Sequence, residues 1–87
     1  MATVFIPPLI RDVTNGQSKV AVSGDSVREV IAVLETRFPG ITARLCEDGL
    51  IRPGMAVVVD NEVSTVGLRH RLLETSEVHF LPAISGG

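Results

Sequence analysis

One stretch of the chain reads SVREVIAVLETRF (residues 26–38), and it specifies its own structure more clearly than any other part of the sequence. Ser26 suits a helix N-cap, and Glu29 is placed to reach back to the cap's own N–H group. Apolar residues follow at the spacing of one helical face, namely Val27, Val30, Ile31, Leu34 and Phe38. Pro39-Gly40 then ends the pattern. The stretch therefore predicts a helix over residues 27–38 with one buried face.

Two segments before this helix are typical of strands. ATVFI (residues 2–6) is β-branched and aromatic, and Pro7-Pro8 after it removes two backbone donors. SKVAV (residues 18–22) is the second of these segments. Asn15-Gly16 lies between the segments and is a strong turn signal, because both residue types tolerate positive φ. We therefore expect a β-hairpin.

The part of the chain after the helix predicts a loop and more strands. Residues 41–54 suggest one short helical turn and a loop. The β-branched run MAVVV (residues 55–59) is typical of a central strand with both faces mostly covered. A short strand near residues 62–66 and a final strand over 77–81, which ends at Pro82, complete the set.

This element order predicts an α+β roll, in which one main helix packs across a mixed four- or five-stranded sheet. A right-handed crossover through the helix brings a later strand beside the first one, so the terminal strands should lie at the centre of the sheet. We expect a domain over residues 1–82 and a flexible tail over residues 83–87.

Composition narrows the function classes. The chain has 87 residues, of which 45% are hydrophobic, so it suits one small domain. Its single cysteine, Cys46, excludes a disulfide framework and a four-cysteine metal site, and it suits a reducing, cytoplasmic compartment. Eight basic and ten acidic residues are interspersed, with a net charge of −2, so we expect no nucleic-acid partner. The apolar runs fall far short of the ~20 residues that span a bilayer, so we expect no membrane association.

The end of the sequence carries the chemistry. The chain finishes in Gly86-Gly87 after the predicted strand that ends at Pro82. Six residues extend about 20 Å at most, and glycine has no Cβ, so the last atoms fit a narrow channel. Such a tail can deliver a carboxylate into the active site of another protein. The alternative is an inert, disordered stub.

The ending LPAISGG (residues 81–87) resembles the Leu-Pro-x-x-x-Gly-Gly ending of the MoaD/ThiS family of sulfur carrier proteins. The capped helix of residues 26–38 and VVVDNE (residues 57–62) resemble that family too. Further residues resemble the branch that serves cysteine-synthase-type enzymes: Ile6-Pro7, Leu9, Arg11, residues 14–17 and Pro39-Gly40-Ile41.

The resemblance implies a ubiquitin-like β-grasp fold and a role as a protein co-substrate, not an enzyme. A ubiquitin-activating-type partner enzyme would use ATP and Mg²⁺ to adenylate Gly87, and sulfur would then convert it to a thiocarboxylate. Ile84, Ser85 and Gly86 would thread into the partner. The sulfur acceptor would be a cysteine-synthase-like enzyme, the large subunit of molybdopterin synthase or a thiazole-synthase-like enzyme, with secondary-metabolite pathways as a further destination. No bound cofactor is implied.

The chain's own side chains suggest no catalytic or metal site. His70 and His79 are the only imidazoles and have no carboxylate at helical metal-ligand spacing, so we expect both at the surface. Cys46 lacks an activating basic cluster, and we expect a passive thiol. Glu47-Asp48 is expected to be a solvated turn.

Strand alternation predicts a partner interface beside the tail. With Val78 pointing toward the helix, His79 and Leu81 point to the opposite face of the sheet. The same alternation turns Phe5 and Val58 outward. We expect Phe5, Val58 and Leu81 to form an exposed apolar patch, which usually marks an interaction site, with His79 on the same face.

Two other readings remain open at this point. A ubiquitin-like modifier would use the same activated Gly87 to acylate a lysine of a target, although a single lysine, Lys19, leaves little room for branched polymers of this chain. The second alternative is a β-grasp interaction module whose glycine tail is inert.

Overall fold

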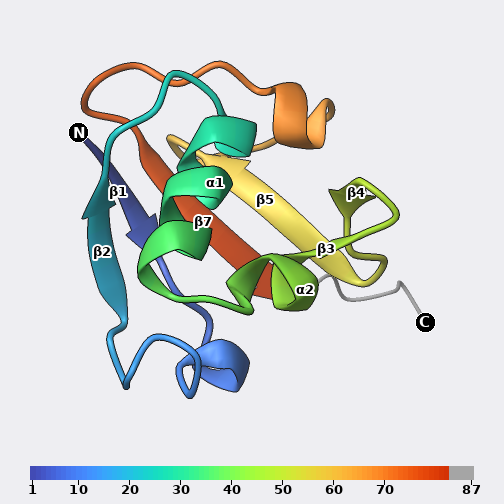
Figure 1. The fold of residues 1–87 in the computed structure, drawn as a ribbon. Helices are drawn as coiled ribbons and strands as arrows, with labels where there is room; N and C mark the ends of the chain where they lie inside the picture. The colour runs from blue at the N-terminus through green and yellow to red at the C-terminus, as the bar shows by residue number, and fades with distance from the viewer. Residues whose placement is uncertain (83–87) are drawn as a thin grey trace.

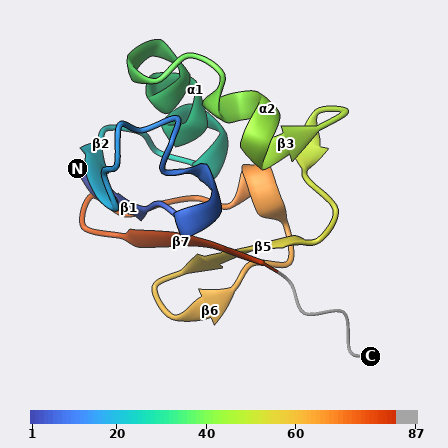
Figure 2. The ribbon, with the colours of Figure 1, turned by 90° about the horizontal axis from the view of Figure 1, so that it is seen from below.

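The computed structural model describes residues 1–82 of the chain. A five-stranded sheet has the strand order β2-β1-β7-β5-β6, and both α-helices lie on one side of it (Figures 1 and 2). Its strands are β1 (Ala2–Phe5), β2 (Lys19–Val22), β5 (Met55–Val59), β6 (Glu62–Val63) and β7 (Glu77–Pro82). One main helix across a mixed sheet is the α+β roll that the sequence predicts.

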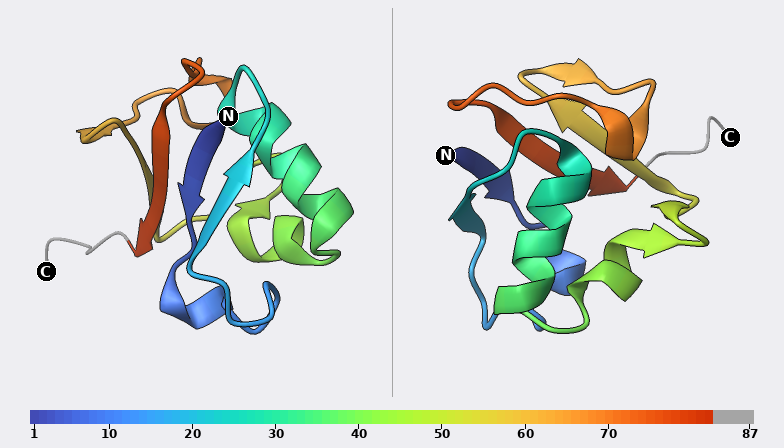
Figure 3. Two further views of the ribbon diagram at one scale, coloured as in Figure 1. Left: turned by 90° about the vertical axis from the view of Figure 1, so that its left-hand side faces the viewer. Right: turned by 45° about the horizontal axis from the view of Figure 1, so that its top comes forward.

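The two terminal strands lie side by side in the middle of the sheet. β1 and β7 pair in parallel, with Val4 opposite Val78, and β7 also pairs antiparallel with β5. The N-terminus therefore lies at one end of β7, and the described chain ends at the other (Figure 3). The predicted crossover is confirmed, and it brings the residues just before the tail into the central strand of the sheet.

The main helix, α1 (Val27–Arg37), begins as the sequence predicts, with one difference. Ser26 Oγ accepts a hydrogen bond from the backbone N–H of Glu29 at 3.2 Å. The Glu29 carboxylate accepts from the N–H of Asp25 at 2.8 Å, not from that of Ser26, so the expected partner was wrong by one residue. An antiparallel bridge between Ser26 and Arg71 holds this segment extended, and that geometry turns the N–H of Asp25 toward the helix.

The core lies between α1 and the sheet. The predicted apolar stripe of α1 is buried, and it packs on the inward residues of the strands. Burying one such side chain stabilises the fold by roughly 1.5–3 kcal/mol. The inward residues of the strands are Ala2, Val4, Val20, Val22, Val57, Val59, Val78 and Phe80.

The connection between β1 and β2 is longer than one turn. The two strands pair antiparallel as predicted, but a short 3-10 helix, η1 (Pro8–Ile10), and a series of turns lie between them. Asn15 and Gly16 have φ values of 56° and 84°, which confirms the predicted turn. The buried Thr14 hydroxyl donates to the carbonyl of Gln17 at 2.8 Å and ties the connection together.

Residues 41–54 contain the predicted helical turn, α2 (Ile41–Leu45), but the predicted loop is wrong in part. β3 (Cys46–Glu47) and β4 (Leu50–Ile51) form a small separate hairpin. Asp48 and Gly49 connect its arms with φ values of 54° and 76°, a geometry that an Asp-Gly pair adopts easily.

β5 departs from its prediction because only one of its faces is covered. Val57 and Val59 are buried under the helices, while Ala56 and Val58 on the other face are half-buried. No described element covers that face of the sheet (Figure 2). A second 3-10 helix, η2 (Gly67–Arg69), follows β6. Within residues 1–82, no helix has the length and apolar character needed to cross a bilayer.

Candidate functional site

The site is built around the end of β7, from which the glycine-rich tail continues. β7 runs to Pro82, which lies opposite Met55 of β5. Ile84, Ser85, Gly86 and Gly87, which the sequence marks for threading and for the covalent step, lie outside the described residues. The geometry that the structure gives is therefore that of the residues around the end of β7, at the base of the tail.

The four residues predicted to form a partner interface share the outward face of the sheet. Phe5 lies opposite His79 in the β1–β7 pair, and His79 lies opposite Val58 in the β5–β7 pair. Leu81 is two positions further along β7, on the same face, and its side chain is 45% exposed. Phe5, Val58 and His79 are half-buried, because they cover one another, so the patch is less exposed than predicted. Their shared face is confirmed; their role as an interface stays a prediction.

An aromatic stack fixes the centre of this face. The rings of Phe5 and His79 are parallel within 4°, with centroids 4.1 Å apart. Lys19, the cross-strand partner of Phe5 on β2, places its Nζ 6.0 Å from the centroid of the phenyl ring. The ammonium group is within the range of a cation–π contact, which adds a positive charge to the apolar surface.

Two open hollows flank the end of β7. The aromatic hollow, of about 380 Å³, lies on the outward face and is lined by Phe5, Ile6, Pro7, Pro8, Arg11, Ser18, Lys19, His79, Phe80 and Leu81. The proline hollow, of about 360 Å³, lies beside Pro82 and is lined by Pro7, Leu9, Ile10, Arg44, Arg52, Pro53, Gly54, Met55 and Pro82. Leu81 and Pro82, the last two described residues, thus each line one hollow.

A model of the ThiS family matches residues 5–87, which is nearly the whole chain and includes both terminal glycines. This chain belongs to the ThiS family. Sulfur carrier protein CysO from Mycobacterium tuberculosis and that from Mycobacterium bovis are each 34% identical to it over 90 residues, which cover 98% of this chain and 97% of the relative.

Solved structures support the assignment to the ThiS family. CysO of Mycobacterium tuberculosis has a TM-score of 0.90 at 32% identity and covers 97% of this chain and 100% of its own. A chain of the BexX/CysO complex of Amycolatopsis orientalis has a TM-score of 0.89 at 33% identity, with all of both chains covered. The small archaeal modifier protein 1 of Methanosarcina acetivorans, at 21% identity, has a TM-score of 0.80 and covers 99% of this chain and 95% of its own, and it shares the fold. These matches confirm the ubiquitin-like β-grasp fold.

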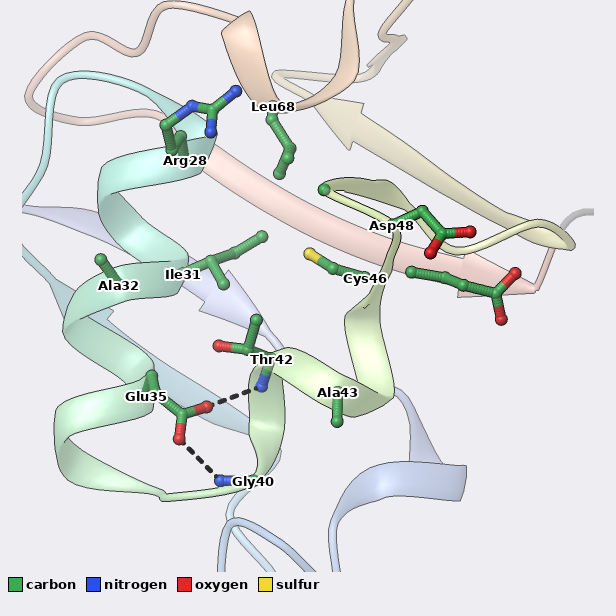
Figure 4. A pocket seen from close by; sticks show the side chains of 12 residues that line it. Arg28, Ile31, Ala32, Glu35, Gly40, Thr42, Ala43, Cys46, Asp48 and Leu68 are labelled. Carbon is green, nitrogen blue, oxygen red and sulfur yellow. Dashed lines mark hydrogen bonds between the residues drawn. The ribbon is translucent and has the colours of Figure 1, made fainter.

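A wider hollow of this ThiS-family domain lies away from the end of β7, between α1, α2 and the β3–β4 hairpin (Figure 4). It has a volume of about 790 Å³, and the side chain of Cys46 points into it. Burial raises the pKa of the Cys46 thiol above its ordinary value of 9.0, and the charge of Arg28 lowers it by less. The thiol is therefore protonated at neutral pH and is a poor nucleophile, which agrees with the predicted passive role.

His70 contacts Ser64, a residue that the sequence did not single out. Ser64 Oγ lies 2.8 Å from Nδ1 of His70, but it also accepts hydrogen bonds from the N–H groups of Val66 and Gly67. These two N–H groups lie at the start of η2, so the Ser64 hydroxyl helps to fix the turn that leads into this helix. His70 and His79 are both half-buried, contrary to the surface positions expected for them. Across residues 1–82, no three His, Cys, Asp or Glu side chains gather as metal ligands would.

Sequence reasoning missed the basic side chains of the two hollows. Arg11 was quoted only for the family resemblance, and Arg44 and Arg52 were not assigned any role. These residues come from the β1–β2 connection, α2 and the segment before β5, so no local pattern in the sequence groups them. The tertiary fold brings Arg44 and Arg52 to the proline hollow and Arg11 to the aromatic hollow.

Proposed function

We propose that this protein is a sulfur carrier whose C-terminal Gly87 holds the sulfur as a thiocarboxylate. The observation that carries the proposal is the match of residues 5–87, with both terminal glycines, to the ThiS family. The identity of 34% to the sulfur carrier CysO over nearly the full length supports it. The protein is then a co-substrate of other enzymes and not an enzyme.

The chemistry at Gly87 requires two steps by a partner. A C-terminal carboxyl group has an ordinary pKa of about 3.3–3.7, so it is ionised at neutral pH and is a poor acyl donor. An adenylating enzyme joins the carboxylate to the α-phosphate of Mg²⁺-bound ATP and releases pyrophosphate. Sulfide or a persulfide then attacks the carbonyl carbon and displaces AMP; with a persulfide, a thiol reductant releases the second sulfur. The product is the thiocarboxylate of Gly87.

Two partners follow from this chemistry: the adenylating enzyme, and a synthase that accepts the sulfur. We infer that both dock on the outward face formed by Phe5, Val58, His79 and Leu81, because this face continues into the tail along β7. The similarity to CysO and the resemblance to its branch favour a cysteine-synthase-type acceptor. A relative that crystallised in the BexX/CysO complex supports a carrier that acts while bound to another protein. We place these reactions in the cytoplasm, where a reducing environment preserves the thiocarboxylate and the Cys46 thiol.

Removing the last residue tests the proposal. The chain that lacks Gly87 and the intact chain are each incubated with the adenylating enzyme of the same organism, ATP, Mg²⁺ and sulfide, and sulfur transfer to an acceptor synthase is measured. The proposal predicts near-complete loss of transfer with an unchanged unfolding midpoint. Substituting Ala for the exposed Thr75, which lies just before the start of β7 and so at the opposite end of this strand from the tail, is the control and should transfer normally. Normal transfer by a chain that lacks Gly86 and Gly87 would refute the proposal.

A further inference from the structure

Each hollow beside the end of β7 carries two basic side chains. Arg11 and Lys19 line the aromatic hollow with Leu81, and Arg44 and Arg52 line the proline hollow with Pro82. We call these four residues the basic collar. No acidic residue of the described chain lines either hollow. The collar is notable because the whole chain has a net charge of −2.

The charges of the collar are only partly neutralised inside the molecule. Arg44 forms an ion pair with Asp12 at 3.1 Å and also donates to the carbonyl of Leu9. Arg11 and Arg52 donate to backbone carbonyls, which fix their positions but carry no full negative charge. Lys19 lies over the Phe5 ring. In these interactions of the described residues, only one of the four cations of the basic collar, Arg44, is therefore paired with a carboxylate.

Acidic groups gather at the opposite end of β7 instead. Glu77 is the first residue of the strand, and the carboxylate of Asp60 accepts hydrogen bonds from its N–H and from Ser76. The carboxylates of Asp60 and Glu77 therefore lie where β7 begins, and the basic collar lies where the strand ends. A charge separation of this kind orients an approaching partner before contact.

We propose that the basic collar docks on an acidic rim around the mouth through which the partner enzyme takes the tail. The proposal rests on the proposed function and adds the charge of the partner surface to it. The collar meets the rim and not the ATP phosphates, since a threaded tail of five residues carries the carboxyl of Gly87 on the order of 15 Å beyond Pro82. Complementary charges at a rim act mainly on association and orientation.

Charge reversal tests the collar. Lys19→Glu/Arg52→Glu changes one exposed cation in each hollow, and Arg69→Glu/Arg71→Glu is the matched control with the same change in net charge. The control residues are also exposed and lie near the start of α1, where Arg71 is bridged to Ser26. Thiocarboxylate formation by the adenylating enzyme of the same organism is measured against the concentration of the carrier. The unfolding midpoint of each variant is measured in parallel.

We expect Lys19→Glu/Arg52→Glu to raise KM for the carrier about tenfold at low salt with kcat unchanged, and the control to leave KM within about twofold. The neutral variant Lys19→Gln/Arg52→Gln, which avoids repulsion, should give an intermediate KM. For the wild type, KM should rise between about 50 mM and about 500 mM salt, because salt screens rim charges. Equal KM values for the two charge reversals, or a KM that salt does not change, would overturn the collar while leaving the sulfur-carrier proposal intact. A wild-type chain that forms no thiocarboxylate at all would refute both.

Discussion

The imidazole of His79 lies flat against the phenyl ring of Phe5, with 4.1 Å between the ring centroids and 4° between the ring planes. The two residues are direct partners in the parallel pair of β1 and β7, on the face that the helices leave uncovered. Their contact covers much of each ring without burying either one. The outward face is therefore ordered before any partner binds, which lowers the entropy cost of docking.

Alanine substitutions of the outward His79 and the inward Phe80 should distinguish an effect on docking to the partner from an effect on the stability of the fold. We expect His79→Ala to lower the free energy of unfolding by about 1 kcal/mol, because it loses one half-exposed stacking contact. It should raise KM for the carrier in thiocarboxylate formation. Phe80→Ala, one position along β7, removes a fully buried ring and should cost about 3–5 kcal/mol. Urea denaturation measures both, and a His79→Ala variant with unchanged KM would argue against docking on this face.

The N-cap of α1 should make a measurable contribution to stability. Ser26→Ala removes the oxygen that accepts from the N–H of Glu29, so we expect a loss of about 1 kcal/mol in the free energy of unfolding. Ser26→Asp keeps an acceptor at the cap and serves as the control. Equal losses for the two variants in urea denaturation would show that the hydroxyl is not the group that matters.

The carboxylate of Glu35 should make stability depend on pH. It accepts hydrogen bonds from the N–H groups of Gly40 and Thr42, which lower its pKa from the ordinary value of 4.5 (Figure 4). A group whose pKa is lowered by folding stabilises the fold above its unfolded pKa, and this contribution is lost as the pH falls through the folded pKa. The stability difference between the wild type and Glu35→Gln should therefore shrink as the pH falls from about 6 to about 3. A difference that stays constant over this range in urea denaturation would contradict the assignment.

The thiol of Cys46 should take no part in sulfur transfer. Because burial raises its pKa, iodoacetamide should alkylate it more slowly in the folded protein than in urea at the same pH. The Cys46→Ala variant should form thiocarboxylate at the wild-type rate. Loss of thiocarboxylate formation in a variant that keeps its fold would instead make Cys46 a sulfur relay.

Elements with a strict period could be predicted from the sequence. The stripe of α1 and the alternation along β7 place Leu34 and Phe80 inward and His79 outward without knowledge of the tertiary structure. The shared outward face of Phe5 and His79 followed, because the crossover rule puts their strands side by side. The outward face at the centre of the candidate site could therefore be predicted from strand alternation alone.

Features that depend on long-range contacts could not be predicted in this way. Arg44 reaches Asp12 and Leu9 across more than thirty positions of the chain, and Ser64 reaches His70 across a turn whose geometry no local pattern specifies. The β3–β4 hairpin has strands of only two residues, which is too short for any periodicity to show. The basic collar was missed for the same reason, since four separate segments contribute to it.

The mass of the C-terminal tryptic peptide tests the central claim most directly. Cleavage after Arg71 yields residues 72–87, which contain neither methionine nor cysteine, so oxidation of those residues cannot imitate the replacement of oxygen by sulfur. In protein recovered from its native cells, we predict a fraction of this peptide that is about 16 Da heavier, with the added mass confined to Gly87. A peptide that keeps an ordinary carboxyl group, even after incubation with the adenylating enzyme, ATP, Mg²⁺ and sulfide, would contradict the account.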